Sequence, residues 1–154
     1  MISRRANKAD IPQMLPLWRE IADIHSAMEK MYVTVPGAEA KFAVYLESML
    51  DKENTRVIVA EIDGKIAGYV IGTVSTMPDV FVLKKRMYVQ DMVIDPTYRR
   101  QGIARKLMGD ILTYAKEQEV EKLDLMVAVK NEGANKFWRE MGFEPALNYM
   151  NLYL

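Results

Sequence analysis

The spacing of apolar and polar positions predicts that the first half of the chain holds two helices followed by a hairpin. Apolar side chains recur at helical spacing over residues 11–31 and again over residues 38–51, as in helices with one buried face. Runs rich in β-branched residues over 56–62 and 65–74 predict two strands. The Asp63–Gly64 pair between them indicates a tight hairpin turn, because both turn positions require a positive φ.

The second half of the chain continues this alternation of elements. A long strand is expected over residues 80–94, followed by a helix over 102–119 and a buried strand over 122–129. A short helix is expected over 133–141, and the weakly alternating tail from Ala146 to Leu154 indicates a closing strand. The resulting order, ααβββαβαβ, predicts the α/β or mixed α+β class, with a mixed sheet that carries helices on both faces.

Length and composition indicate one globular domain with its own core. The 154 residues match the usual size of a single domain, and half of them are apolar. Lys and Arg number 21, and Asp and Glu also number 21, so the net charge is zero. Without an excess of positive charge, the chain has no overall field to attract nucleic acid or an anionic membrane, and neither partner is expected.

The scarcity of cysteine and histidine argues against several kinds of site. No cysteine is present, which excludes disulfides, thiolate metal sites and cysteine nucleophiles. His25 is the only histidine, so a multi-histidine metal centre or a Ser-His-Asp triad has almost nothing to build on, and no metal is expected. The chain shows no signal-peptide pattern and no apolar run of the ~20 residues that cross a bilayer. We therefore expect a soluble cytoplasmic protein.

The clearest chemical signal lies where the long strand meets the next helix. Asp95–Pro96 ends the strand, a short basic turn follows, and the helix begins near Gly102. N–H groups at a helix start have no partner within the helix, and the helix dipole is positive there, so the turn is suited to bind a phosphate. Arg99, Arg100 and Arg105 would add positive charge for a diphosphate. The alternative is an ordinary connection with a solvated basic turn.

Two segments resemble motifs of one enzyme family. The spacing Arg99-x-x-Gly102-x-Ala104 fits neither the P-loop nor the dinucleotide-binding fingerprint. It resembles the acyl-CoA pyrophosphate signature R/Q-x-x-G-x-G/A of the N-acetyltransferase (GNAT) superfamily. Residues 131–143 resemble the second motif of that family, N-x-x-A-x-x-F/L-Y-x-x-x-G-F. The resemblance covers nearly the whole chain and implies a GNAT-like, mostly antiparallel mixed sheet in which the fourth and fifth strands of the family splay apart.

The resemblance implies acetyl-CoA as the cofactor and assigns residues to it. The pantetheine arm would add as a strand in the gap between the splayed strands, against the backbone of Met92, Val93 and Ile94. The asparagine that binds this arm in the family corresponds to Asn131, whose alternative role is a helix N-cap. Lys136 could approach a cofactor phosphate or could be a solvated helix lysine. The diphosphate would lie on the loop and helix start formed by Arg99, Arg100, Gln101, Gly102, Ile103, Ala104 and Arg105.

The implied reaction is direct attack of a neutral primary amine on the thioester, which needs a base, an acid and a donor for the carbonyl oxygen. The backbone N–H of Val93 is the nearest match to the donor in the family. Many members have a tyrosine as general acid where this chain has Trp138. An indole N–H gives up no proton at accessible pH, and the apolar stripe of this helix favours packing for Trp138. A thiolate can leave without strong protonation, because a thiol has a pKa of ~8.5.

The general base is less well defined by the sequence. Some members have a glutamate where this chain has Tyr88 or Gln90, and neither side chain is a good base. Asp91 is the only carboxylate in the middle of the strand, and simple alternation places it on the face opposite Tyr88 and Gln90. A β-bulge near Met92 would turn Asp91 toward the cleft. The alternative is an aspartate bonded to a neighbouring loop.

The leading hypothesis is an acetyl-CoA-dependent N-acetyltransferase that acts on a small-molecule or peptide amine. A catalytically impaired acyl-CoA-binding sensor or partner domain is the alternative, because the tyrosine and the glutamate of the family are both missing. The acceptor would be set by residues 25–38, where His25 and Glu29 could reach it, and by loops around Pro78 and Ala146. The apolar tail could pair two copies into a homodimer or close the sheet within one monomer.

Overall fold

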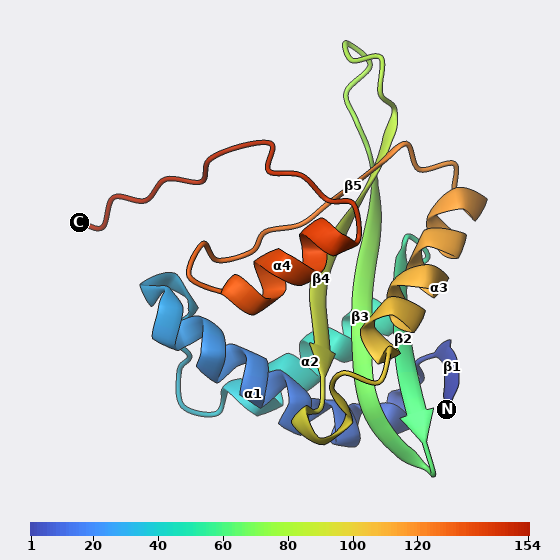
Figure 1. The fold of residues 1–154 in the computed structure, drawn as a ribbon, viewed down its shortest axis with the longest axis vertical. Helices are drawn as coiled ribbons and strands as arrows, with labels where there is room; N and C mark the ends of the chain where they lie inside the picture. Colours follow the sequence, from blue (N-terminus) through green and yellow to red (C-terminus); the bar gives the residue numbers. More distant parts are fainter.

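A single five-stranded sheet runs through the computed structural model, which describes all 154 residues (Figure 1). Its strands are β1 (Ile2–Arg5), β2 (Thr55–Ile62), β3 (Lys65–Thr76), β4 (Lys85–Ile94) and β5 (Lys122–Asp124). They lie side by side in chain order, and the first four pair in antiparallel fashion. β4 and β5 pair in parallel, so the sheet is mixed and mostly antiparallel, as expected.

Four helices cover the two faces of this sheet. They are α1 (Ile11–Met28), α2 (Ala38–Leu50), α3 (Ile103–Glu117) and α4 (Glu132–Glu140), and short 3-10 turns cover Lys8–Asp10, Lys30–Tyr32 and Pro96–Tyr98. One buried cluster, which includes Met14 and Leu46, joins α1 and α2 to one face. A second cluster, which includes Leu107 and Trp138, joins α3 and α4 to the other face. Both faces are therefore buried, which explains why β2 and β3 read as nearly continuous apolar runs.

Most of the predicted elements are confirmed. α1 begins at the expected residue and ends three residues early, and α2 ends one residue early. The Asp63–Gly64 turn joins β2 to β3 with φ values of 50° and 77°. No helix combines the length and the apolar character needed to cross a membrane. The cytoplasmic location stays a prediction.

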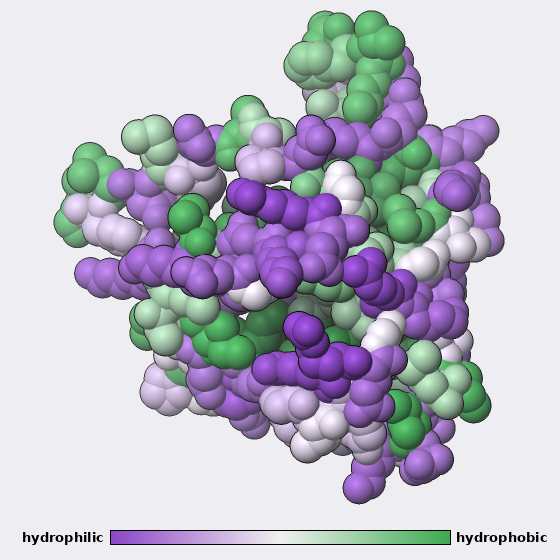
Figure 2. Space-filling model, viewed as in Figure 1, coloured by the Kyte–Doolittle hydropathy of each residue, from purple (hydrophilic) through white to green (hydrophobic).

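Several strand predictions are wrong. β1 is missing from the predicted order, because Ile2–Arg5 is too short to establish an alternating pattern. Residues 80–84, which were expected to begin a strand, instead form the exposed tip of the β3–β4 hairpin. Val80 and Val82 at this tip are 85% and 95% exposed, and Figure 2 shows the tip as an apolar protrusion. Apolar residues with no facing surface cannot form the half-buried strand that their sequence indicates.

The two later strands are also shorter than expected. β5 ends at Asp124, and the residues up to 129 continue without strand structure. The tail over residues 146–154 forms no strand, and Leu147 and Leu152 within it are 93% and 86% exposed. None of its residues pairs with a strand of the sheet. The pairing of this tail with a second copy stays a prediction.

The sheet opens between β4 and β5. Only three residue pairs join these strands, from Arg86–Lys122 to Tyr88–Asp124. Beyond Tyr88, β4 continues to Ile94 with no strand partner on that side. The predicted splay is confirmed, and it leaves a row of backbone groups unpaired along β4.

A β-bulge interrupts β4 at Gln90. Val89 pairs with Gly72 and Asp91 pairs with Ile71, so Gln90 has no backbone pairing partner in β3. Directly opposed residues point to the same face, and Ile71 belongs to the cluster beneath α1 and α2. Asp91 therefore faces this layer together with Gln90, which bonds to α2. The simple alternation that places these two residues on opposite faces is wrong, because Gln90 is the extra residue of the bulge and shifts the alternation of β4 by one.

Candidate active site

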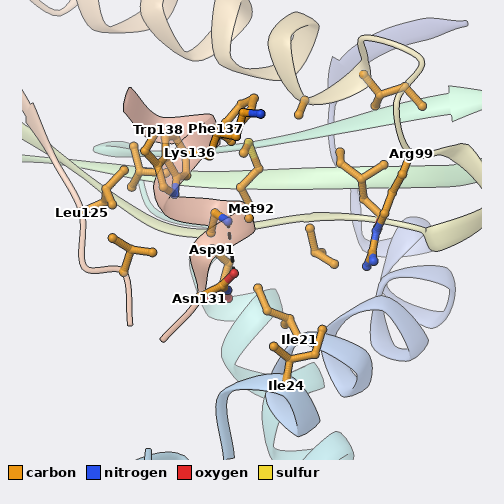
Figure 3. Close-up of a pocket in the computed structure, with 18 of the residues that line it drawn as sticks. Ile21, Ile24, Asp91, Met92, Arg99, Leu125, Asn131, Lys136, Phe137 and Trp138 are labelled. Atoms are coloured by element: carbon orange, nitrogen blue, oxygen red, sulfur yellow. Dashed lines mark hydrogen bonds between the residues drawn. The ribbon is translucent and has the colours of Figure 1, made fainter. Parts of the chain in front are cut away.

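A cavity of about 680 Å³ opens between β4 and the segment that follows β5. Its lining comes from α1, the second half of β4, the loop and helix start after it, residues 125–127 and α4. Figure 2 shows a hollow with an apolar floor between hydrophilic rims, and Figure 3 shows side chains of α1, β4 and α4 around it. The cavity exists because β4 and β5 separate after three pairs.

The start of α3 presents unpaired N–H groups to this cavity. Gly102 is the N-cap with a φ of 81°, a left-handed conformation that glycine adopts without strain. The first hydrogen bond of the helix runs from the Lys106 N–H to the Gly102 carbonyl (3.0 Å). The N–H groups of Ile103, Ala104 and Arg105 therefore have no partner within the helix, and all three residues line the cavity. With the helix dipole, they make this end suited to an anion.

The basic residues of the loop carry less free charge than the sequence indicates. Arg99 forms an ion pair with Glu20 of α1, and Arg105 forms one with Glu140 of α4 (2.9 Å). Arg100 lines the cavity with a φ of 64° and forms no ion pair. One of the three guanidinium charges is therefore left for a ligand, and most of the anion-binding capacity rests on backbone N–H groups.

The open edge of β4 offers its backbone groups in an alternating pattern. The Asp95 N–H donates to the Ala67 carbonyl of β3 (2.9 Å), and successive residues of an antiparallel strand bond alternately toward opposite sides. The Val93 N–H therefore points to β3, whereas the N–H groups of Met92 and Ile94 point into the cavity. An arginine side chain of the loop donates to the Ile94 carbonyl from the cavity side (3.1 Å), in agreement with this pattern. The donor expected at Val93 is engaged in the sheet, and Met92 is the neighbour that faces the cavity.

Asp91 is the unpaired acidic residue in the lining. Its carboxylate is partly buried and forms no hydrogen bond or ion pair within the chain. Burial raises the pKa of Asp91 from 3.8 to about 6, because its charged form loses water without gaining a cation. Asp91 is therefore ionised at neutral pH, with a pKa close enough to that pH for exchange of a proton.

A chain of polar side chains beside Asp91 crosses three strands and reaches α2. Gln90 donates to the Tyr45 hydroxyl oxygen (3.0 Å) and accepts from Thr73 (3.2 Å), which in turn bonds to Thr55 (3.0 Å). The Tyr45 oxygen accepts a bond from Gln90, so its own proton is left to donate elsewhere. These bonds fix the bulged residue, and with it the backbone that positions Asp91.

Burial also shifts the pKa values of aromatic side chains near Asp91. The pKa values of Tyr32, Tyr45 and Tyr69 are all raised, chiefly by desolvation and in part by the charge of Asp91. Burial lowers the pKa of His25, whose ring lies 5.3 Å from that of Tyr32. His25 lines the cavity as a partly buried side chain, and its lowered pKa favours the neutral ring.

The start of α4 closes the cavity opposite β4. Asn131 is the N-cap of α4, and its side-chain oxygen accepts from the Ala134 N–H (3.1 Å; Figure 3). The side chain of Asn135 donates to the carbonyls of Asn131 and Ala128 (2.8 Å each), which ties the preceding loop to the helix. Asn131 and Lys136 both line the cavity. The N-cap role of Asn131 is confirmed, and the cofactor roles of both residues stay predictions.

Trp138 lies in the wall of the cavity as a packed side chain. It is 9% exposed, with its ring edge-on to Phe137 and Phe143 at centroid distances of 5.0 and 5.2 Å. It belongs to the core cluster beneath α3 and α4. The packing role expected from the helical stripe is confirmed.

Among the residues that the sequence assigns to catalysis or to the cofactor, two lie outside the lining, namely Tyr88 and Gln101. Glu29, which is expected near the acceptor, also lies outside it and accepts a hydrogen bond from the Tyr153 hydroxyl. Tyr88 lies where β4 still pairs with β5, one residue before the splay, and burial raises its pKa. Gln101 is exposed, and its amide reaches back to the Thr97 carbonyl (3.5 Å). The structure therefore brings none of these three side chains to the cavity.

Sequence reasoning missed the wall that α1 contributes and the polar chain behind Asp91. Ile21 and Ile24 line the cavity, although the helical pattern indicates only core packing for Ile21 and does not single out Ile24. Their spacing with His25 was the available signal, because the three positions lie on neighbouring parts of one helical face. The partners of Gln90 had no such signal, because they depend on the bulge.

Comparison with known proteins decides the family of the chain. Residues 18–143 match the model of the Acetyltransferase (GNAT) family. The chain belongs to this family. It is therefore an N-acetyltransferase by family, and the family uses acetyl-CoA.

Several related proteins are also named N-acetyltransferases. An uncharacterised N-acetyltransferase of Archaeoglobus fulgidus is 29% identical over 135 residues, which cover 88% of this chain and 87% of the relative. The L-amino acid N-acetyltransferase AaaT of Escherichia coli is 25% identical over 130 residues, which cover 82% and 76%. The match to an uncharacterised N-acetyltransferase of Methanocaldococcus jannaschii, 28% identical over 102 residues, spans 44% of the length of that relative.

Solved structures show the same fold. A tetramutant of the BH1408 protein from Bacillus halodurans superimposes with a TM-score of 0.90 at 24% identity, covering both chains completely. The aminoglycoside N-acetyltransferase AAC(6')-Iy in complex with CoA superimposes with a TM-score of 0.75 at 14% identity, covering 99% and 98% of the two chains. At these identities, the likeness establishes the GNAT fold.

Proposed function

We propose that this GNAT enzyme transfers the acetyl group of acetyl-CoA directly to a primary amine. The observation that carries the proposal is the composition of one cavity. It combines the free N–H groups of the α3 start, the unpaired edge of β4 and the unpartnered carboxylate of Asp91. Figure 3 places Arg99 of the loop and Asp91 well apart along β4, so an extended ligand would connect the two ends.

The residues of the cavity fit acetyl-CoA as an extended ligand. Its diphosphate would bind the N–H groups of Ile103, Ala104 and Arg105. Its pantetheine amides would pair with the backbone of Met92 and Ile94, in the manner of an added strand. When bound, acetyl-CoA supplies the acetyl group as an activated thioester.

Three further lining residues have roles in this proposal. Arg100, whose guanidinium forms no ion pair, would add charge beside the diphosphate. Lys136 lies on α4 and would contact a phosphate from the opposite wall. Asn131 would present its backbone and the α4 start to the pantetheine arm, while its side chain caps the helix.

Asp91 acts as the general base in this proposal. An aliphatic ammonium has a pKa of ~10 and must lose a proton before its nitrogen can attack. Asp91 accepts this proton, directly or through one water, because its pKa of about 6 leaves it ionised at neutral pH. The neutral amine then forms the C–N bond while the C–S bond breaks, and the nitrogen releases its second proton to water. The Met92 N–H stabilises the charge on the carbonyl oxygen, and the sulfur leaves as a thiolate without a proton from Trp138.

Release of free thiol from acetyl-CoA across a panel of primary amines tests this proposal, with mass spectrometry of the acetylated product. Asp91→Asn should lower kcat by about a hundredfold or more and leave the affinity for acetyl-CoA within about twofold. Asp23→Asn is the matched control, because Asp23 lies on α1 outside the cavity with a side chain that is 68% exposed. Its rate should equal that of the wild type. Tight acetyl-CoA binding without acetylation of any amine would contradict the proposal and favour an acyl-CoA sensor.

A further inference from the structure

Asp91 is the one buried or partly buried carboxylate in the chain that has no partner. Every other such side chain accepts a hydrogen bond or forms an ion pair. These pairs are Asp10 and Glu61 with Arg4, Glu20 with Arg99, Glu29 with the Tyr153 hydroxyl, Asp95 with Thr97, Asp110 with Lys106, and Asp124 with Arg86. A carboxylate that is removed from water without a cation is unfavourable, so a ligand that brings a cation to Asp91 gains from it.

Charge is distributed unevenly along the cavity. The arginines of the loop and of the α3 start lie at one end, and Lys136 of α4, the one lysine of the lining, forms no ion pair with Asp91. Two acidic residues line the cavity, and Glu140 is already paired with Arg105 (2.9 Å). Burial alone accounts for the raised pKa of Asp91, so no basic side chain of the protein compensates its charge. The Asp91 end therefore holds a single negative charge without a counter-ion.

The walls around Asp91 offer apolar surface and neutral polar groups. Ile21 and Ile24 of α1 lie across the cavity from it in Figure 3. His25 is neutral at pH 7, because burial lowers its pKa. Tyr45 in the middle of α2 lies outside the lining, is 37% exposed, and has a hydroxyl that accepts a hydrogen bond from Gln90 beside Asp91. None of these groups supplies a second charge for a ligand.

We propose that the acceptor is a compact monoamine with an apolar body, bound as its ammonium. The charged head would meet Asp91, and the body would pack against Ile21 and Ile24. A second ammonium or a carboxylate on the acceptor would lie in this end of the cavity without a counter-ion, and its lost hydration would weaken binding. The inference rests on the proposed acetyl transfer, because it names the acceptor of the same site.

Calorimetric titration of the CoA-bound protein tests this inference without turnover. Four compounds share one aromatic body: 2-phenylethylamine, its neutral analogue 2-phenylethanol, the amino acid phenylalanine, and the diamine 4-(2-aminoethyl)benzylamine. We expect 2-phenylethylamine to bind at least tenfold more tightly than each of the other three. The alcohol isolates the contribution of the charge, and the other two isolate the cost of a second charged group.

Variants of Asp91 distinguish the contribution of its charge to amine binding from the contribution of its size and shape. Asp91→Asn should weaken the binding of 2-phenylethylamine at least tenfold and leave that of 2-phenylethanol unchanged. Asp91→Glu should retain part of the preference for the amine, and Asp23→Asn should retain all of it. The unchanged alcohol affinity shows that the Asn variant keeps the folded cavity.

Each outcome bears on one of the two proposals. Equal affinities for the amine and the alcohol, or an amine preference that persists in Asp91→Asn, would overturn the monoamine subsite. Acetylation that favours phenylalanine or the diamine would overturn it as well and leave acetyl transfer intact. Selective amine binding that is followed by no acetylation of any amine would overturn the proposed function instead.

Discussion

Replacement of Asp91 by asparagine should stabilise the protein at neutral pH while it abolishes efficient turnover. The folded protein holds the pKa of Asp91 at about 6, above the ordinary 3.8, because burial disfavours the charged form. The folded state therefore binds the Asp91 proton more tightly than the unfolded state. Stability from this group is largest at low pH and is lost as pH rises from about 4 to about 6.

The size of this effect follows from the pKa shift. The difference between 3.8 and about 6 corresponds to about 3 kcal/mol of unfolding free energy at pH 7.5, and water in the open cavity makes this an upper bound. At pH 4.5, the folded carboxyl is almost wholly protonated and avoids the cost of a buried charge, so the same relation leaves about 1 kcal/mol. Each 1 kcal/mol is worth roughly 2–4 °C in Tm at this chain length, so we expect a rise of roughly 3–10 °C at pH 7.5.

Thermal unfolding of the wild type and Asp91→Asn at pH 4.5, 6 and 7.5 measures this effect, with kcat recorded on the same samples. The gain in Tm should grow with pH, and kcat should fall by about a hundredfold or more. The acidic limb of the wild-type kcat profile should fall near pH 6, where Asp91 takes up a proton. A lower Tm for the variant at pH 7.5, or a gain independent of pH, would refute the account of a buried, unpartnered carboxylate.

Three further predictions concern the rest of the structure. Gly102→Glu should weaken acetyl-CoA binding at least tenfold, about 1.4 kcal/mol, more than Gly102→Asn, which tolerates the φ of 81° without adding charge; equal calorimetric affinities in both variants would argue against the phosphate site. Trp138→Tyr should lower the unfolding free energy by about 1–3 kcal/mol and leave the alkaline limb of the pH–rate profile unchanged; a shifted limb would restore an acid role at this position. Tyr69→Phe should cost no stability, because the buried Tyr69 hydroxyl has no hydrogen-bond partner; a loss above about 1 kcal/mol in a denaturant titration would reveal one.

The sequence predicts the parts of the site that depend on local patterns. The loop before α3 is recognisable because a strand end, a glycine and a helix start follow one another within a few residues. Asn131 is recognisable as an N-cap for the same reason. Trp138 shares a helical stripe with other apolar residues, and its packed position follows from that stripe. Each of these features depends only on residues that lie close together in the sequence.

Features that depend on pairing between strands are not encoded locally. The bulge at Gln90 appears only when β4 is aligned with β3, and it decides which way Asp91 faces. The register also decides that the N–H of Met92, and not that of Val93, reaches the cavity. The splay decides that Tyr88 stays outside, because β5 still pairs with β4 at that residue. The alternation of residues along a strand does not by itself predict the direction of Asp91, the N–H group that faces the cavity, or the position of Tyr88.

Amide chemical shifts in a titration of the labelled protein with acetyl-CoA test the central claim most directly, namely that the cofactor joins the α3 start to the open edge of β4. The account predicts the largest changes at the N–H groups of Ile103, Ala104, Arg105, Met92 and Ile94. The Val93 N–H, which is engaged with β3, should change less than those of its two neighbours. Large changes confined to another surface, with the amides at the start of α3 unmoved, would contradict the account.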